Sequence, residues 1–363
     1  MFWGGWAVAA ADVEHDLGLG HGGFGLLLSA ALAAAALTNA FGGAVAERRG
    51  TVRVLALAFG GWSVLLLSMV LVRAPWAMGV LVVGAIAAGG VVDVVMNVAA
   101  TAGLAGDPGG LVRFHGRFNF GAAVGAATMG LVRLAGGSWR WGWLVAGVGG
   151  AVLAWSFARL PPGALPAGEA GDAVRFRSVV TLLRRQRLVV VALAFALGSM
   201  VEGGVELWGV LFLRTSWSRG LTLGAGSAVA GYLVAMTARV VLGPVAGRRG
   251  PVVGVAVGAG AASLGMVVLA WSPVAVVAGM GLVVAAGGIS LCWPLLLALA
   301  ASGSGADRPG AVVGAVTSVG YLGFVVGPSL VGLLAGRFGL RAGLVALAVA
   351  AVFVAVAPAL RRT

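Results

Sequence analysis

Long apolar segments recur along nearly the whole chain and constrain its fold more than any other feature. An α-helix needs about 20 residues to cross about 30 Å of hydrocarbon. Eleven segments meet that length, at 23–46, 54–72, 77–102, 114–134, 141–158, 188–213, 221–246, 251–272, 274–300, 311–336 and 340–359. Short joints with turn and charge signals separate them. The sequence therefore predicts an all-α, multi-pass membrane protein.

The scarcity of charge excludes most other classes of protein. Only 10% of the residues are charged, whereas about a quarter are charged in a soluble domain. This excludes soluble enzymes. It also excludes the interpretation that the net charge of +13 serves to bind nucleic acid. The chain has no lysine, which excludes P-loop and Schiff-base chemistry. Its single cysteine, Cys292, and three scattered histidines offer no metal site, so neither an enzyme nor a cofactor is expected.

An internal repeat divides the chain into two related halves. Residues 43–50 read GAVAERRG, and 200 positions later residues 243–250 read GPVAGRRG. At nearly the same offset, residues 121–125 (GAAVG) match residues 323–327 (GFVVG). Such repeats are common in transporters. We therefore expect twelve helices in two pseudo-symmetric six-helix bundles, residues 1–159 and 188–363, joined by a basic linker over 160–187.

The same offset predicts a shortened first helix. Shifted by 200 positions, Met1 falls on Val201, well inside the span 188–213. The first helix is therefore expected to lack about a dozen residues at its start, by comparison with its repeat. On this interpretation the natural chain begins upstream of Met1.

Arginine placement predicts how the chain is oriented. Most arginines fall on the side of the membrane that holds the linker, as the positive-inside rule requires of a cytoplasmic side. Tryptophans such as Trp76 and Trp217 gather at the opposite interface. We expect a protein of the cytoplasmic membrane with both termini in the cytoplasm.

One short motif resembles that of a known family. The major facilitator superfamily carries a loop of roughly G-x-x-x-D-R-x-G-R-R between its second and third helices. Here Gly43, Glu47, Arg48 and Gly50 match, with glutamate for aspartate, and the second-half copy keeps Gly243, Arg248 and Gly250. The resemblance implies alternating access, in which two bundles rock about a central cavity. It also implies that a gating loop is formed by Gly43, Glu47, Arg48, Gly50, Arg248 and Gly250.

A narrower resemblance is to the bacterial branch near the fucose permeases. The segments that carry it are 93–97, 113–121, 202–208, 235–239 and 320–324. This branch implies a transporter without specifying the solute. The R-x-x-Q-G pattern of proton antiporters is absent from the fourth helix, and Ala126 stands where their fifth helix has proline. Both departures argue against drug efflux.

Three acidic residues inside predicted spans are the candidates for proton coupling: Asp93, Glu202 and Glu206. A charge at the centre of a membrane helix costs about 2.5–3.5 kcal/mol, so it is retained for a reason. Glu202 and Glu206 are four residues apart and share one helix face. The alternative is that a carboxylate only fixes packing, or that Asp93 closes an inner gate by pairing with an arginine such as Arg117.

Polar and aromatic residues within spans are the candidates for solute contact. They are Asn39, Asn97, Asn119, Trp208, Arg239, Trp293 and Tyr321. Packing or lipid contact is the alternative for each aromatic ring, and pairing or snorkelling is the alternative for Arg239. His115 is assigned to the membrane interface, and Trp293-Pro294 predicts a kink in the tenth helix.

Together these features predict a secondary transporter that imports a small polar organic solute, such as a sugar, with protons. A monomer suffices for that mechanism. One alternative is an exporter of an amphiphilic compound or drug in the same fold. Another is a membrane sensor or scaffold that does not transport.

Overall fold

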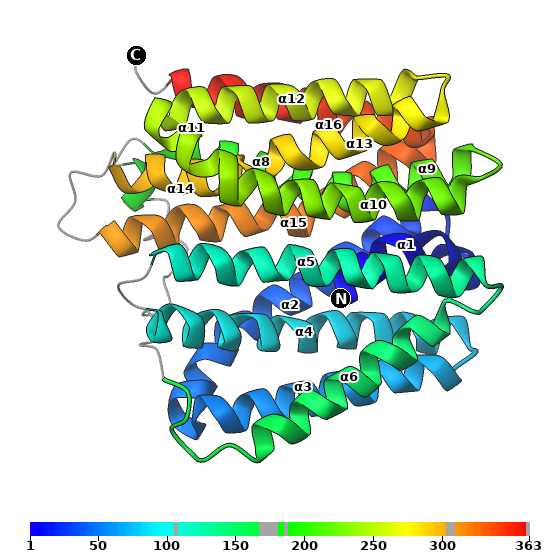
Figure 1. The fold of residues 1–363 in the computed structure, drawn as a ribbon, viewed down its shortest axis with the longest axis vertical. Coiled ribbons are helices and arrows are strands. Elements are labelled where there is room, and N and C mark those ends of the chain that lie inside the picture. Colours follow the sequence, from blue (N-terminus) through cyan, green and yellow to red (C-terminus); the bar gives the residue numbers. More distant parts are fainter. Residues whose placement is uncertain (105–107, 167–180, 185–187, 303–308, 361–363) are drawn as a thin grey trace.

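The computed structural model describes residues 1–104, 108–166, 181–184, 188–302 and 309–360. Within these ranges the regular structure is helical throughout, as predicted. Figure 1 shows long helices running side by side, with their connections gathered at two ends of the molecule. One end holds the end of α1 together with α9; we name it the Asp12 end. The other end holds α11 and α14; we name it the linker end.

The helices of residues 1–159 cross the molecule in alternating directions. They are α1 (Phe2–Asp16), α2 (His21–Arg49), α3 (Thr51–Leu71), α4 (Pro75–Gly103), α5 (Pro108–Leu134) and α6 (Arg140–Ala158). Proline starts α4 and α5, where its missing N–H is tolerated.

Three crossings in residues 188–363 are interrupted. The first consists of α8 (Val189–Gly204), η1 (Val205–Gly209) and α9 (Val210–Ser216). The second consists of α10 (Gly220–Thr237), η2 (Ala238–Leu242) and α11 (Gly243–Arg249). The third consists of α13 (Ala275–Ser290) and α14 (Cys292–Ser302). The remaining three helices are α12 (Pro251–Trp271), α15 (Pro309–Phe338) and α16 (Leu340–Leu360). The break at Leu291 lies just before the predicted kink at Trp293-Pro294, because Pro294 can stand only in the first turn of α14.

Every predicted span coincides with one of these crossings. Ten of the described helical segments are long and apolar enough to cross a membrane. The segment predicted at 114–134 lies in α5, which is not among the ten. The helix α1 has 15 residues, too few for a full crossing. The repeat-based explanation of this short helix stays a prediction.

The motif predicted as a gating loop is mostly helical, which corrects the sequence-based interpretation. Residues 43–49 are the last two turns of α2, and 243–249 form α11. Only Gly50 and Gly250 lie outside the helices, with φ of 85° and 108°. An L-residue is strained at such angles, so glycine permits each tight reversal into the next helix.

Helices from the two halves of the sequence pack directly against each other. The helix α2 packs on α4 and on α15, and α5 packs on α10 as well as on α1. Figure 1 shows α5 near α10, at the boundary between the blue–cyan and the green–red helices. At this boundary the N–H of Ser329 donates to Ser29 Oγ over 2.9 Å. Many large apolar side chains on the outer surface are exposed, as a lipid-facing surface requires.

Candidate functional site

A salt bridge inside the membrane-spanning region joins two of the predicted site residues. The guanidinium of Arg239, in η2, donates to the carboxylate of Glu202, in α8. Arg239 Nε also donates to the Ser290 carbonyl oxygen at 3.0 Å. The two charged side chains retain 21% and 13% of their accessible surface. Arg239 is therefore paired with protein groups in this state, as the alternative interpretation allowed, and its role as a solute ligand stays a prediction.

The second carboxylate of this crossing, Glu206, lies next to the salt bridge and forms no salt bridge with another described residue. Glu206 is in η1 and lines a narrow pocket with Glu202 and Tyr232. The groups that act on it electrostatically are Glu202, Arg239 and the Tyr232 hydroxyl. The predicted proximity of the two glutamates is thus realised. The cluster holds two carboxylates and one guanidinium, so a single added proton brings its net charge to zero.

Both parts of the cluster are built on π-helical segments. Glu206 lies within η1, which begins three residues after Glu202, and Arg239 lies within η2. A π-helical turn shifts the backbone hydrogen bonds by one residue and is frequent at functional sites. Here the wider turns occur in neighbouring crossings, at the residues whose charges meet.

Asp93, in α4, has a different environment. It is exposed, and Asn97 donates to its carboxylate over 3.0 Å, as the four-residue spacing predicts. The charge of Asp93 also acts on the hydroxyl of Tyr321, in α15 from the other half. The alternative ion pair with Arg117 is not seen among the described residues, where Asn97 is the hydrogen-bond partner of Asp93. Asp93 therefore stays a candidate for proton coupling, with an exposed carboxylate.

Aromatic rings from three helices adjoin this region. Trp293 packs on Phe195 with ring centroids 4.4 Å apart and meets Tyr321 edge-on at 6.0 Å. The indole N–H of Trp293 donates to Ser199 Oγ at 3.2 Å. Two of the predicted aromatic contacts, Trp293 and Tyr321, thus lie together. Their rings offer the apolar faces on which a planar or C–H-rich solute stacks.

Trp208, the third predicted aromatic contact, lies elsewhere. It is 1% exposed and packs against Phe24 and His21, which belong to α2. A Cβ on Gly332 of α15 would meet its ring at 3.1 Å. These neighbours place Trp208 in the packed region between helices of the two halves. In this state Trp208 makes packing contacts, and its role in solute contact stays a prediction.

Two predicted asparagines have polar atoms without hydrogen-bond partners. Asn39 Oδ1 is buried beside Gly90 of α4, where a Cβ would come within 2.9 Å of it. Asn119 is 2% exposed, and its Nδ2 is buried and unpaired. An unpaired buried amide costs free energy, so both groups are available to a partner that enters. Arg117, on α5, is exposed, and the side chain of His115 lies outside the described residues.

No group of three or more histidine, cysteine, aspartate or glutamate side chains that would hold a metal ion occurs among the described residues. Cys292 is buried in α14. The site therefore consists of carboxylates, one arginine, amides and aromatic rings, a set suited to binding and proton uptake.

The comparison with protein families identifies this arrangement. A family model described as Major Facilitator Superfamily matches residues 1–328. The chain belongs to the Major Facilitator Superfamily. This confirms the resemblance carried by the Gly43–Gly50 motif, and it makes the protein a transporter of the membrane rather than an enzyme. The narrower resemblance to fucose permeases is not specifically supported.

Solved structures of other superfamily members share the fold. A bacterial homologue of the human lysosomal transporter Spinster, inward-facing and occupied, has a TM-score of 0.78 at 16% identity and covers 99% of this chain and 93% of its own. The nucleoside transporter NupG has a TM-score of 0.78 at 14% identity, covering 99% and 95%. A D-xylose-proton symporter has a TM-score of 0.73 at 15% identity, covering 98% and 93%. No curated protein matches the sequence.

The superfamily motif residues lie at the linker end. Glu47 and Arg48 are exposed in the last turn of α2, and Glu47 has an interaction partner. In the second-half copy, Arg248 Nε donates weakly to the Pro244 carbonyl at 3.4 Å within α11. The gating role of Gly43, Glu47, Arg48, Gly50, Arg248 and Gly250 stays a prediction.

Sequence reasoning missed one charged cluster of this superfamily member, at the Asp12 end. Asp12 and Asp16, on α1, contact Arg133, Arg140 and Arg214. The sequence analysis did not single out any of these three arginines. The available signal was the four-residue spacing of the two aspartates near the end of an apolar helix, which puts both on one face.

Proposed function

We propose that this superfamily member imports a small polar organic solute across the cytoplasmic membrane together with protons. The two halves, residues 1–159 and 188–363, would rock as six-helix bundles and expose a shared cavity alternately at the linker end and at the Asp12 end. The linker end would be cytoplasmic, in keeping with the arginines of residues 160–187. A monomer suffices, and lipid is the only other partner required.

The observation that carries this proposal is the cluster of Glu202, Glu206 and Arg239. With both carboxylates ionised, the cluster has one negative charge in a low-dielectric region, which favours uptake of a proton. Taking up one proton removes the excess charge, and losing it restores the charge. A charge within a membrane is costly, so its neutralisation is coupled to which state of the protein is stable.

The solute would bind between α4 and the aromatic rings of the second half. Asp93 and Asn97 offer a carboxylate and an amide, and Trp293 and Tyr321 offer ring faces. The unpaired amides of Asn39 and Asn119 are further hydrogen-bonding groups. This combination suits a hydroxyl-rich solute with apolar faces, such as a sugar or a nucleoside. Structural relatives described as a nucleoside transporter and a D-xylose-proton symporter support that class of solute.

Proteoliposomes with a trapped pH-sensitive dye test the proposal directly. A panel of sugars, polyols and nucleosides is added outside, and solute-dependent proton entry is recorded. Glu202→Gln, Glu206→Gln and Asp93→Asn each remove one candidate proton carrier with little change of shape. We expect at least one of them to abolish proton entry. Asp16→Asn, which removes a carboxylate at the Asp12 end, serves as the control and retains proton entry.

Two results would contradict the proposal. If no solute drives proton entry although the protein is folded, the hypothesis of symport of this class of solute is wrong. Export of an amphiphilic compound then becomes the hypothesis to test. If proton entry persists in all three carboxylate variants, the transporter is not coupled through these residues.

A further inference from the structure

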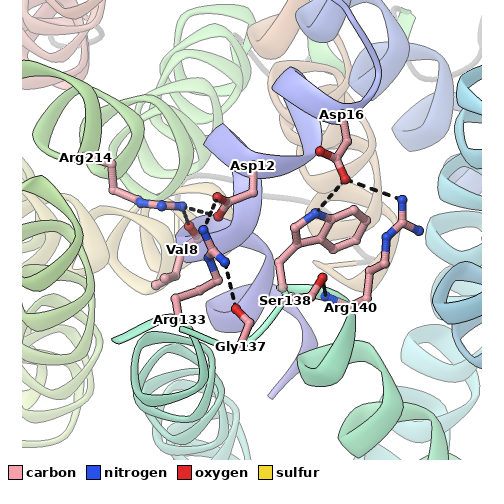
Figure 2. Close-up of polar contacts among 9 residues, drawn as sticks. Val8, Asp12, Asp16, Arg133, Gly137, Ser138, Arg140 and Arg214 are labelled. Atoms are coloured by element: carbon pink, nitrogen blue, oxygen red, sulfur yellow. Dashed lines mark hydrogen bonds and ion pairs between the residues drawn. The ribbon is translucent and has the colours of Figure 1, made fainter. Parts of the chain in front are cut away.

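The charged cluster at the Asp12 end joins the two halves of the chain through one carboxylate. Arg133 Nη2, from the end of α5, donates to Asp12 Oδ1 at 3.0 Å. Arg214 Nη1, from α9, donates to Asp12 Oδ2 at 2.7 Å. Figure 2 shows Asp12 between the two guanidinium groups, which approach it from different helices. Each oxygen of the carboxylate therefore has its own arginine.

The two arginines differ in the half of the chain to which they belong. Arg133 is in the same half as Asp12, and it is also fixed by a 2.7 Å hydrogen bond to the Gly137 carbonyl. Arg214 belongs to the second half and reaches across to α1, where it also donates to the Val8 carbonyl. Any movement that separates α9 from α1 must break the contacts of Arg214 and can leave those of Arg133 intact.

A second aspartate, one turn further along α1, makes contacts within the first half. The indole N–H of Trp139 donates to Asp16 Oδ2 at 3.0 Å, and Arg140 Nη2 lies 3.4 Å from the same oxygen. Arg140 Nη1 in turn donates to the carbonyls of Met69 and Val72 at 2.7 Å. Figure 2 shows this group beside the Asp12 group. Asp16 therefore resembles Asp12 in type and helix, although its side chain is more exposed, and its contacts among the described residues lie within the first half.

The Arg214 contact is enclosed by protein. The side chains of Arg214 and Asp12 retain 9% and 15% of their accessible surface. The neighbouring helix α10 passes so close that a Cβ on Gly224 would lie 2.6 Å from Arg214 Cγ. Near this end the halves also meet through Ser29 and Ser329. By contrast, Asp93 is exposed in the part of α4 that leads to the linker end. The molecule is thus closed at the Asp12 end.

We propose that Asp12 is the carboxylate of a latch that holds the Asp12 end closed through Arg214, and that Arg133 keeps this carboxylate paired when the latch opens. The proposal rests on the proposed function, in which the two halves move relative to each other. An enclosed carboxylate left without a partner would oppose opening strongly. Because Arg133 stays with Asp12 in both states, the latch stabilises the closed state without making it irreversible.

Excess positive charge makes the same latch reversible. Two guanidinium groups share one carboxylate, so the closed cluster carries a net positive charge among the groups shown in contact. When Arg214 moves away, a neutral pair of Asp12 and Arg133 is left behind, and Arg214 can reach water near the membrane surface. The closed state is favoured by hydrogen bonds to charged groups and opposed by the repulsion of the two arginines.

Spin-label distances across the Asp12 end test the latch in the full chain, reconstituted in lipid nanodiscs. The labels are placed at Ala135→Cys and Ser218→Cys, two exposed connections from different halves, in a Cys292→Ser background. Asp12→Asn and Arg214→Gln remove the link, and we expect the population with a long distance to rise about tenfold or more. Asp16→Asn is the matched control and should keep the distance distribution of the parent protein. Arg133→Gln would leave Asp12 unpaired on opening and removes the repulsion of Arg214, so it should not raise the long-distance population.

The proposal is overturned if Asp12→Asn and Arg214→Gln leave the distribution unchanged, or if Asp16→Asn opens the end as much as Asp12→Asn does. Asp12→Asn preserves side-chain shape, so the test stands even where Arg214→Gln fails to fold. Failure of the latch is distinguishable from failure of the proposed function. If an added solute lengthens the distance in the parent protein while the latch variants do nothing, transport stands and the latch is wrong. If the latch variants open the end but no solute drives protons, the latch stands and symport is wrong.

Discussion

At the scale of single residues, the salt bridge between Arg239 and Glu202 is the contact most sensitive to losing one partner. Arg239→Met leaves Glu202 as an uncompensated charge and should destabilise the protein by about 3–5 kcal/mol. The double variant Glu202→Leu/Arg239→Met removes both charges and should recover most of that loss. Thermal unfolding in detergent measures both effects.

Arg117→Gln is the control for this cycle, because Arg117 is exposed. It should leave the unfolding temperature nearly unchanged. A double variant no more stable than Arg239→Met alone would mean that the arginine contributes through packing rather than through its charge.

The sequence identified the residues of this salt bridge but not the salt bridge itself. Both were singled out because charge within a span is costly. Their pairing joins positions 37 residues apart, close to two π-helical turns that no local sequence pattern predicts. The contact between Asp93 and Asn97 was predictable, because a four-residue spacing fixes it within one helix. Asp12 and Arg214 are 202 positions apart, which explains why the latch was missed.

At the scale of helices, the spans were predictable because length and hydropathy decide them. The close packing of α12 on α13 was not, since it depends on which glycines face each other. A Cβ on Gly265 would lie 2.5 Å from the Gly281 carbonyl oxygen and 2.6 Å from Ala285 N. In a membrane, such small residues let backbones approach and replace the hydrophobic effect as the basis of helix association.

This packing predicts opposite results for two substitutions on the same helix. Gly265→Ala should lower the unfolding temperature, because backbone atoms of α13 occupy the space that the added methyl group needs. Gly260→Ala meets nothing within 4 Å and should be neutral or slightly stabilising. Both variants gain the same helix propensity, so the difference between them isolates the packing. Equal unfolding temperatures would show that the two helices separate easily.

At the scale of the whole molecule, the proposed function requires that the two halves separate at the Asp12 end, and a covalent link there should stop transport. The backbone N–H of Ser329 in α15 donates to Ser29 Oγ in α2 at 2.9 Å, so a pair of cysteines at these positions is the natural choice for a link between the halves. In Ser29→Cys/Ser329→Cys, oxidation should abolish solute-dependent proton entry, and reduction should restore it.

The control link lies within one half. Thr38 Oγ1 donates to the Ala87 carbonyl at 2.7 Å, which places α2 and α4 of the first half in similar contact. In Thr38→Cys/Ala87→Cys, oxidation should leave transport unchanged, because these helices would move together as one bundle. Loss of transport in both double variants would mean that the halves are not rigid. Persistence of transport in the cross-linked Ser29/Ser329 pair would mean that the Asp12 end need not open, and it would refute alternating access between these two halves.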